Sequence, residues 1–262
     1  MKVKKIIVLN YHLISREPVP STFSALKRFS LNEREFISQM ELIRQLKIPV
    51  VPIELILSDT YCHDLAVAFT FDDGNISDYE IVFPILQSFQ FTAAFFPVTD
   101  MISSQGKITW PRLSELAANN FTIGSHGISH TALTKLSPEQ KKHEIRNSKL
   151  LLEKKLNCRI KYFSAPFGLY DKETIRMALE AGYSSILTTR KRPNKDPGKH
   201  SIIDRWNVSE NISAESLNDI FSREGNLPFG KALFSPITET GKRFLGSRFV
   251  NKIINYQFNN RK

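Results

Sequence analysis

The chain has 262 residues, of which 41% are hydrophobic and 24% are charged, and its formal net charge is +10. A chain of this size can bury roughly 70–75% of the surface that its unfolded form exposes, so we expect one folded domain rather than extended disorder. No apolar run approaches the ~18 residues of a membrane span, and the aliphatic run after Lys5 is too short for a signal peptide core. Cys62 and Cys158 lie far apart without a Cys-x-x-Cys pattern, which argues against a disulfide framework and a thiolate zinc site. We therefore expect a cytoplasmic protein.

Segments typical of strands and helices alternate along the chain. A helix is predicted to begin after Asn32, where Glu35 resembles the third residue of a capping box, and to end before Pro49. Ser137 and Gln140 form a second and stronger capping box, with Pro138 at the first helical position. The further helices predicted from apolar spacing are 78–89, 110–119 and 172–181. The predicted strands are 5–11, 65–71, 91–98, 121–124, 160–164 and 183–188, and residues 190–200 read as a polar loop.

This alternation, with short joints between the segments, indicates an α/β protein whose parallel strands are covered by helices. The pattern fits either a barrel or an open doubly wound sheet. Periodicity alone does not distinguish the two.

Two adjacent carboxylates end the strand predicted at 65–71, in the stretch FTFDDGN. Side chains of a regular strand point alternately to opposite faces, so Asp72 and Asp73 can share one pocket only if the strand ends or bends there. Gly74 permits such a bend. Two like charges a few ångströms apart repel by around 4 kcal/mol at an effective dielectric near 20, so the pair favours a nearby cation. An ordinary Asp-Asp-Gly turn is the alternative explanation.

A pair of histidines supplies further ligands for such a cation. His126 and His130 follow the predicted strand 121–124 at a spacing of four residues, which places both imidazoles on one face if the segment turns helically. Two neutral imidazoles and one carboxylate suit zinc or another borderline divalent metal, with coordination positions left for water.

These motifs resemble those of the polysaccharide deacetylases of carbohydrate esterase family 4, which share the NodB homology domain. TFDDG at 70–74 resembles the first motif of that family, the pair His126 and His130 the second, and SAPFG at 164–168 approximates the third. The resemblance extends from about residue 6 to about residue 210. It implies an irregular (β/α)7-type barrel in a single NodB-like domain, which we place at 1–222, followed by a basic C-terminal extension at 223–262.

The resemblance also implies roles for individual residues. Asp73, His126 and His130 are expected to bind the metal, with zinc as the expected ion and cobalt or nickel as alternatives, and Asp72 is expected to act as general base. By analogy with the family, the backbone N–H of Phe167 would help to hold the oxyanion of the tetrahedral intermediate. Pro166 and Phe167 are expected to shape the substrate wall, although a turn with a core aromatic explains them equally well.

The sequence departs from the family pattern in its third and fourth motifs. Ser164 occupies the place of an arginine that usually orients the catalytic aspartate, an absence also found in the subgroup that acts on poly-N-acetylglucosamine. The fourth motif is only suggested by Asp204-Arg205-Trp206. Trp206 would line the sugar site, and Arg205 is a candidate replacement for the missing charge.

The expected general acid is His12, because no histidine follows His200 and the last motif of the family is therefore absent. His63 and His200 fall in polar loops and His143 in a solvent-facing helix, whereas His12 ends the first predicted strand. The circularly permuted deacetylases, which this N-terminus resembles, use a histidine at that place. A hydrogen-bonded histidine at the barrel mouth is the structural alternative.

We therefore expect a metal-dependent hydrolase that removes acetyl groups from an N-acetylated amino sugar or polysaccharide. An amidohydrolase acting on a small non-sugar amide, and a pseudoenzyme that binds glycan or metal without turnover, remain as alternatives. Residues 223–262 hold eight Lys or Arg against two Glu. Their apolar residues resemble an interfacial or packed helix, so an anionic membrane surface is a candidate partner, which would make the protein membrane-peripheral; no nucleic-acid partner is expected.

Overall fold

The structure, a computed structural model, describes residues 5–20, 27–58, 63–195 and 202–225. Parallel strands form two sheets. The larger sheet has the order β11-β1-β4-β5-β6, with β9 antiparallel to β1, and the smaller has the order β10-β8-β7. The strands of these sheets are β1 (Lys5–Tyr11), β4 (Leu65–Asp73), β5 (Ala94–Pro97), β6 (Thr122–Ile123), β7 (Tyr162–Ser164), β8 (Ser185–Leu187), β9 (Asn194–Lys195), β10 (Ile202–Ile203) and β11 (Trp206–Asn207). A separate parallel pair is formed by β2 (Leu13–Ser15) and β3 (Ser30–Asn32).

The two sheets are connected at two places and share one core cluster, an arrangement called the strand ring below; a closed barrel stays a prediction. A single parallel bridge between Ser125 and Phe163 joins the end of β6 to β7. On the other side only Asp204 and Arg205 separate β10 from β11. The predicted α/β class is confirmed, and the strand ladder is irregular because its hydrogen bonds do not run unbroken round the ring.

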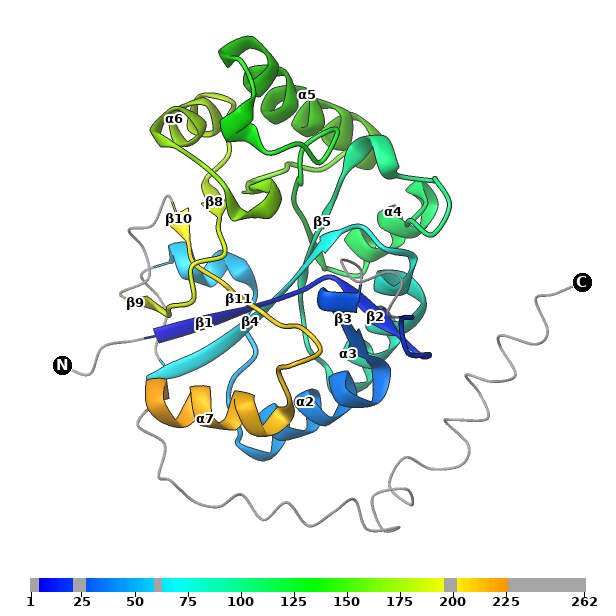
Figure 1. Cartoon of the computed structure of the whole chain (residues 1–262), viewed down its shortest axis with the longest axis vertical. Helices are drawn as coiled ribbons and strands as arrows, with labels where there is room; N and C mark the ends of the chain where they lie inside the picture. Colours follow the sequence, from blue (N-terminus) through cyan, green and yellow to red (C-terminus); the bar gives the residue numbers. More distant parts are fainter. Residues whose placement is uncertain (1–4, 21–26, 59–62, 196–201, 226–262) are drawn as a thin grey trace, which may run out of the picture. The chain divides into compact units, whose positions relative to one another are not determined.

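Helices surround these strands in Figure 1. The α-helices are α2 (Glu33–Gln45), α3 (Phe83–Phe89), α4 (Trp110–Ala118), α5 (Pro138–Leu156), α6 (Lys172–Glu180) and α7 (Ala214–Gly225). Short turns of other helix types are η2 (Ile53–Leu57), the π-helical η3 (Asp78–Val82), η4 (Thr99–Met101), η5 (Leu133–Lys135) and η6 (Pro166–Gly168). The strong capping box predicted at Ser137 and Gln140 is present at the start of α5.

The capping box predicted at Asn32 does not form as expected. Asn32 does cap α2, but its side chain accepts a hydrogen bond from the N–H of Arg34 at 2.9 Å. The Glu35 carboxylate instead accepts a hydrogen bond from the N–H of Ala214 at 2.6 Å and so caps α7. Helix α2 also ends at Gln45, before Pro49, because Lys47 takes a left-handed conformation with φ 53°. Residues 194–195 of the predicted polar loop 190–200 form β9.

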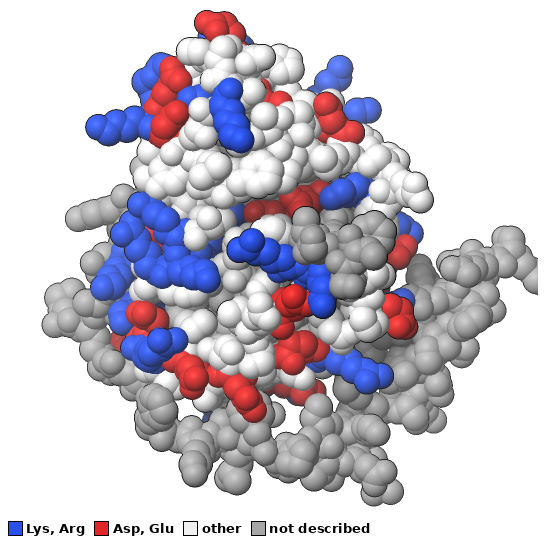
Figure 2. Space-filling view, in the orientation of Figure 1, with Lys and Arg blue, Asp and Glu red and all other residues white. Residues whose placement is uncertain are grey.

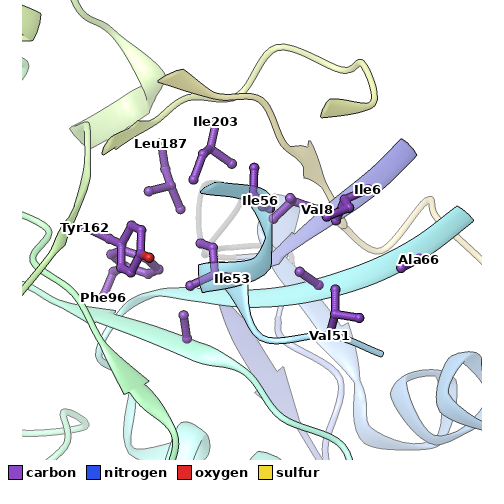
Figure 3. Packing of buried hydrophobic residues seen from close by; sticks show 12 residues of the cluster. Ile6, Val8, Val51, Ile53, Ile56, Ala66, Phe96, Tyr162, Leu187 and Ile203 are labelled. Carbon is purple, nitrogen blue, oxygen red and sulfur yellow. The ribbon is translucent and has the colours of Figure 1, made fainter. Parts of the chain in front are cut away.

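Alternation along the strands builds a core inside the ring. The inward residues of β1 and β4 are Ile6, Val8, Ala66 and Ala68, and the turn η2 adds Ile53 and Ile56 to the same cluster (Figure 3). All six are at most 2% exposed. At roughly 25 cal/mol per Å² of apolar surface removed from water, this packing is the main stabilising contribution in this part of the fold.

The same inward face becomes polar toward the carboxyl ends of the strands. Because side chains alternate with a period of two, the face that carries Val8 also carries Asn10, and the face that carries Ala68 also carries Thr70 and Asp72. Asn10, Thr70 and Asp72 are each at most 2% exposed. A polar layer therefore lies directly above the apolar core.

The proposed extension at 223–262 lies outside the described residues except for 223–225, which belong to α7. The domain boundary at 222 and the interaction of this segment with a membrane therefore stay predictions. Figure 2 shows basic and acidic side chains together on the face that it presents. Within the described ranges, no helix combines the length and apolarity needed to cross a membrane.

Gly124, just after β6, lies where the packing leaves no room for a side chain. A Cβ there would lie 2.2 Å from Cε1 of Phe96 and 2.9 Å from the carbonyl oxygen of Tyr162. We predict that Gly124→Ala lowers the free energy of unfolding by about 1–3 kcal/mol, measured by urea denaturation. The double variant with Phe96→Leu should recover part of this loss; an unchanged midpoint for Gly124→Ala alone would contradict the packing described here.

Candidate active site at the carboxyl ends of the strands

The sequence-predicted site residues come from several strands and meet at one end of the ring. Asp72 and Asp73 end β4, His12 follows β1, His126 follows β6, and Arg205 lies between β10 and β11. The carboxyl ends of parallel strands are where α/β folds place their ligand sites, because loops from neighbouring strands converge there.

The chain bends at the two aspartates, as the sequence predicts. The bend begins one residue before the predicted Gly74, since Asp73 has φ 74° and Gly74 has φ 62°. Asp72 keeps the inward direction of the strand and is 2% exposed. The bend brings the Asp73 carboxylate to the two histidines instead of to the outer face of β4.

Asp73, His126 and His130 form a cluster with the geometry of a metal site. One ligand atom from each residue lies within 4.8 Å of the other two. Asp73 Oδ1 is 3.6 Å from His126 Nε2 and 3.3 Å from His130 Nε2. Asp73 Oδ1 is also buried without a hydrogen-bond partner among the described residues. A buried acceptor that faces two imidazole nitrogens fits a divalent cation, which would satisfy all three groups.

The hydrogen bond and the burial of His126 favour the neutral form in which its Nε2 can bind a metal. Its Nδ1 lies 2.8 Å from the carbonyl oxygen of Ser164, so Nδ1 carries the hydrogen and Nε2 presents its lone pair toward Asp73. Burial lowers the pKa of His126, against the opposing charges of Asp72 and Asp73. The neutral imidazole that metal binding requires is therefore the favoured form.

The segment between the two histidines is a loop and not a helical turn. Gly127 has φ 80° and His130 has φ 60°, so the i, i+4 argument from a helix gives the wrong local structure. The imidazoles nevertheless meet, with ring centroids 5.0 Å apart. Loop geometry, rather than helical periodicity, brings them together.

Asp72 is held by a buried ion pair with Arg205. Nη1 and Nη2 of Arg205 donate to Oδ1 and Oδ2 of Asp72 at 3.0 and 2.8 Å. Arg205 is 0% exposed. Burial raises the pKa of Asp72, but the Arg205 guanidinium overcomes this effect and holds the pKa well below its usual range, with help from His126. Asp72 is therefore an ionised carboxylate at neutral pH.

Arg205 supplies the guanidinium beside Asp72 that the family pattern places at position 164, where this chain has serine. The Ser164 hydroxyl accepts a hydrogen bond from Nη2 of Arg205 at 2.8 Å and donates one to Oδ2 of Asp72 at 3.1 Å. Asn10 also donates to Oδ2 of Asp72 at 3.1 Å. The involvement of Asn10 was not predicted, although its place at the end of β1 offered a signal.

Asp204, next to Arg205, faces away from this network. Its carboxylate accepts hydrogen bonds from Thr188 and Arg190, both at 2.8 Å, and from Arg192. It therefore fixes the chain after β8 rather than contacting Asp72.

His12 lies among the charges of the site. Burial lowers the pKa of His12, while the charges of Asp72 and Asp73 oppose this effect. Its Nδ1 is buried without a hydrogen-bond partner among the described residues, and its ring stacks at an angle against Phe29, 5.0 Å away. His143, as predicted, is exposed on α5, and His200 lies outside the described residues.

Phe167 gives the site an exposed aromatic wall. Its side chain is 59% exposed, and its ring centroid lies 4.7 Å from that of His130. Phe167 has φ 59°, a left-handed conformation that turns the chain after the buried Pro166. Trp206, next to Arg205, is half-buried at the start of β11.

Comparison with known proteins supports the class that the fold and site define. Residues 62–186 match the family model described as polysaccharide deacetylase. YxkH of Bacillus subtilis, whose name assigns it to the polysaccharide deacetylases, is 27% identical over 220 residues, covering 82% of this chain and 75% of that protein.

Two solved structures show the same fold. The deacetylase PplD of Streptococcus pyogenes, solved in complex with acetate, has a TM-score of 0.75 and 23% identity over 83% of this chain and 98% of its own. IcaB from Ammonifex degensii has a TM-score of 0.71 and 22% identity over 82% of this chain and 96% of its own.

Residues 62–186 therefore match the polysaccharide deacetylase domain that the motifs predicted. The class of activity expected from the sequence, hydrolysis of N-acetyl groups on a polysaccharide, is confirmed with it. Dependence on a divalent metal agrees with the family and with the cluster of Asp73, His126 and His130.

We predict that Arg205→Met destabilises the protein by about 3–5 kcal/mol at pH 7, because it leaves the Asp72 charge buried without its partner. The folded pKa of Asp72 is depressed, so the pair stabilises the protein above the unfolded pKa of about 3.9, and this contribution is lost as the pH falls through the folded value. The difference between wild type and variant in urea denaturation should therefore shrink below about pH 4.

The double variant Arg205→Met with Asp72→Asn is the control for this prediction. It removes both charges and should be more stable at pH 7 than Arg205→Met alone. Equal stability of the two variants would contradict the assignment of the loss to an unpaired carboxylate.

Proposed function

We propose that this protein removes acetyl groups from an N-acetylated amino-sugar polymer at the site built by β1, β4, β6 and the β10–β11 junction. The observation that carries this proposal is the division of labour between adjacent aspartates. Asp73 faces two imidazole nitrogens, while Asp72 is held apart from them by Arg205.

Asp73, His126 and His130 would hold the metal ion, and the mixed imidazole and carboxylate donor set favours zinc, with cobalt or nickel as substitutes. A bound divalent ion would polarise the acetamide carbonyl and lower the pKa of water at that position toward ~7. Among the described residues the cluster supplies three protein ligands, which leaves coordination positions for water and substrate.

Asp72 would act as general base. Its carboxylate is ionised and fixed in direction by Arg205, Asn10 and Ser164, so it can accept a proton from the attacking water as the tetrahedral intermediate forms. A base beside the ligand cluster but outside it is what this step requires.

His12 would act as general acid. The charges of Asp72 and Asp73 act on its pKa, and its Nδ1 has no hydrogen-bond partner among the described residues, so it can carry a proton to the leaving amine. The exposed ring of Phe167 would support a sugar face next to His130, and Trp206 would line the same site. The Phe167 N–H is the proposed donor to the oxyanion.

The substrate class proposed is a poly-N-acetylglucosamine-like glycan. The absence of an arginine at position 164 is similar to the absence in the subgroup that acts on this polymer, and the fold extends over nearly the full length of IcaB.

We predict that Asp72→Asn retains bound zinc but loses about 10²–10⁴-fold in kcat, because the base is removed and the three ligands stay. His126→Ala should lose both metal and activity. Zinc content of the purified protein and acetate release from an N-acetylglucosamine oligomer measure the two effects. Circular dichroism should be used to check that Asp72→Asn is folded, because this variant leaves Arg205 without its partner.

Full activity of Asp72→Asn would exclude Asp72 as the base. Wild-type protein that binds zinc and releases acetate only from small non-sugar amides would favour the alternative amidohydrolase. Wild-type protein that binds zinc and releases no acetate from either substrate would favour a pseudoenzyme.

We predict that removal of the proposed acid, His12, likewise lowers activity without loss of metal. His12→Ala should lower kcat by about 10²–10⁴-fold at pH 7 while zinc content and KM change little, because His12 is placed in proton transfer and not in metal binding. His143→Ala, on the exposed face of α5, is the matched control and should keep wild-type kcat. Equal kcat in His12→Ala and wild type would remove His12 from the mechanism.

A further inference from the structure

The loop between the two histidine ligands is held in shape by elements outside the metal cluster. Its backbone visits the left-handed region at Gly127 (φ 80°) and again at His130 (φ 60°), so local preference does not fix it. A loop of this kind holds two ligands at a constant separation only if other groups bind its polar atoms.

The turn η4 supports one side of this loop. The N–H of Thr99 donates to the carbonyl oxygen of Gly127 at 3.1 Å, and the N–H of Asp100 donates to that of Ile128 at 3.1 Å. These bonds fix the carbonyl groups of the loop and leave its N–H groups to other partners.

Glu144 of α5 supports the other side. Its Oε2 accepts hydrogen bonds from the N–H of Ile128 at 2.7 Å and from the N–H of Ser129 at 3.1 Å. Its Oε1 accepts a third from the Ser129 hydroxyl at 2.6 Å. Glu144 is 7% exposed, so this carboxylate is buried against the loop with both oxygens satisfied.

Two successive N–H groups that converge on one oxygen form a small anion-binding concavity in the backbone. A negative charge strengthens such bonds compared with a neutral acceptor, particularly where water is excluded. The fit is close, because a Cβ on Gly127 would lie 3.0 Å from Glu144 Oε2. The carboxylate therefore fixes the chain on the segment that joins His126 to His130.

We infer that Glu144 is a positioning residue of the metal centre: by binding the 128–129 backbone it holds His130 at the distance from His126 and Asp73 that metal binding requires. This inference rests on the metal site proposed above. Helix α5 contributes no proposed ligand, but through Glu144 it would affect the affinity of the site for the metal. Outer-shell partners of this kind typically change metal affinity by about 10–100-fold when removed.

The test measures zinc affinity of the metal-free protein by competition with a chromophoric chelator. Glu144→Ala should raise the zinc Kd about 10–100-fold. Glu144→Gln can keep the N–H bonds through its amide oxygen and should recover most of the affinity. Hydrogen exchange of the metal-free protein gives a second readout, in which the amides of Ile128 and Ser129 should exchange faster in Glu144→Ala than in wild type.

Glu153→Ala is the matched control on the same helix. The Glu153 carboxylate likewise accepts a backbone hydrogen bond, from the N–H of Ile160 at 3.0 Å, but it does so away from the histidine loop. This variant should keep the wild-type zinc Kd. If Glu144→Ala does not fold, Glu144→Asp replaces it, because the shorter side chain keeps the charge but withdraws from the two amides.

The outcomes separate this inference from the proposed function. A wild-type protein that binds no zinc would overturn the metal site itself. A wild type that binds zinc, together with Glu144→Ala or Glu144→Asp of equal affinity, would overturn only the role of Glu144. An equal loss in Glu153→Ala would also overturn it, since the effect would then come from general destabilisation of α5.

Discussion

The buried ion pair between Asp72 and Arg205 is the interaction on which the site depends. Both side chains lie inside the strand ring, where removal of charge from water costs several kcal/mol per ion unless each charge is paired and fully hydrogen-bonded. The structure meets that condition with polar groups from four strands or strand ends: Asn10, Thr70, Ser164 and the Thr188 carbonyl. The network therefore ties the separate strands together at their carboxyl ends, beside the proposed metal site. Asp72 remains ionised there, and its direction is set by the bidentate guanidinium.

The period of two in the strands explains how an apolar core and a charged site occupy the same interior. Along β4 the inward residues run from Ala66 and Ala68 to Thr70 and Asp72, so the interior changes from apolar to polar within one strand. Asp73 would face outward if the strand stayed regular, and its left-handed conformation redirects it to the histidines. One local bend thus gives adjacent carboxylates different partners, two imidazoles for Asp73 and a guanidinium for Asp72.

Much of this arrangement could be predicted from the sequence, because strong local signals coincide with the fold. Strands β1 and β4, the capped helix α5 and the convergence of Asp73, His126 and His130 follow from apolar alternation, capping residues and motif spacing. Features that depend on distant partners could not be derived in this way. Glu35 has the spacing of a capping box but binds Ala214 of α7, and the histidine spacing suggests a helical turn where backbone partners impose a loop. In each case a tertiary hydrogen bond outweighed the local preference. The ring of strands, likewise, depends on a single bridge between Ser125 and Phe163 that no local pattern contains.

The position of Arg205 shows why a missing motif residue does not imply a missing function. An arginine at position 164 would reach Asp72 from the end of β7, whereas Arg205 reaches it from the β10–β11 junction. The two ends lie on opposite sides of β8 in the smaller sheet, and the inward direction brings either side chain to the same central point. Serine at 164 leaves the volume that the guanidinium occupies, and its hydroxyl bonds to both members of the pair. The physical requirement is a guanidinium at a particular place in the interior. A sequence motif identifies the strand end that carries the arginine. A different strand end can supply the guanidinium while the pKa of Asp72 is still held low.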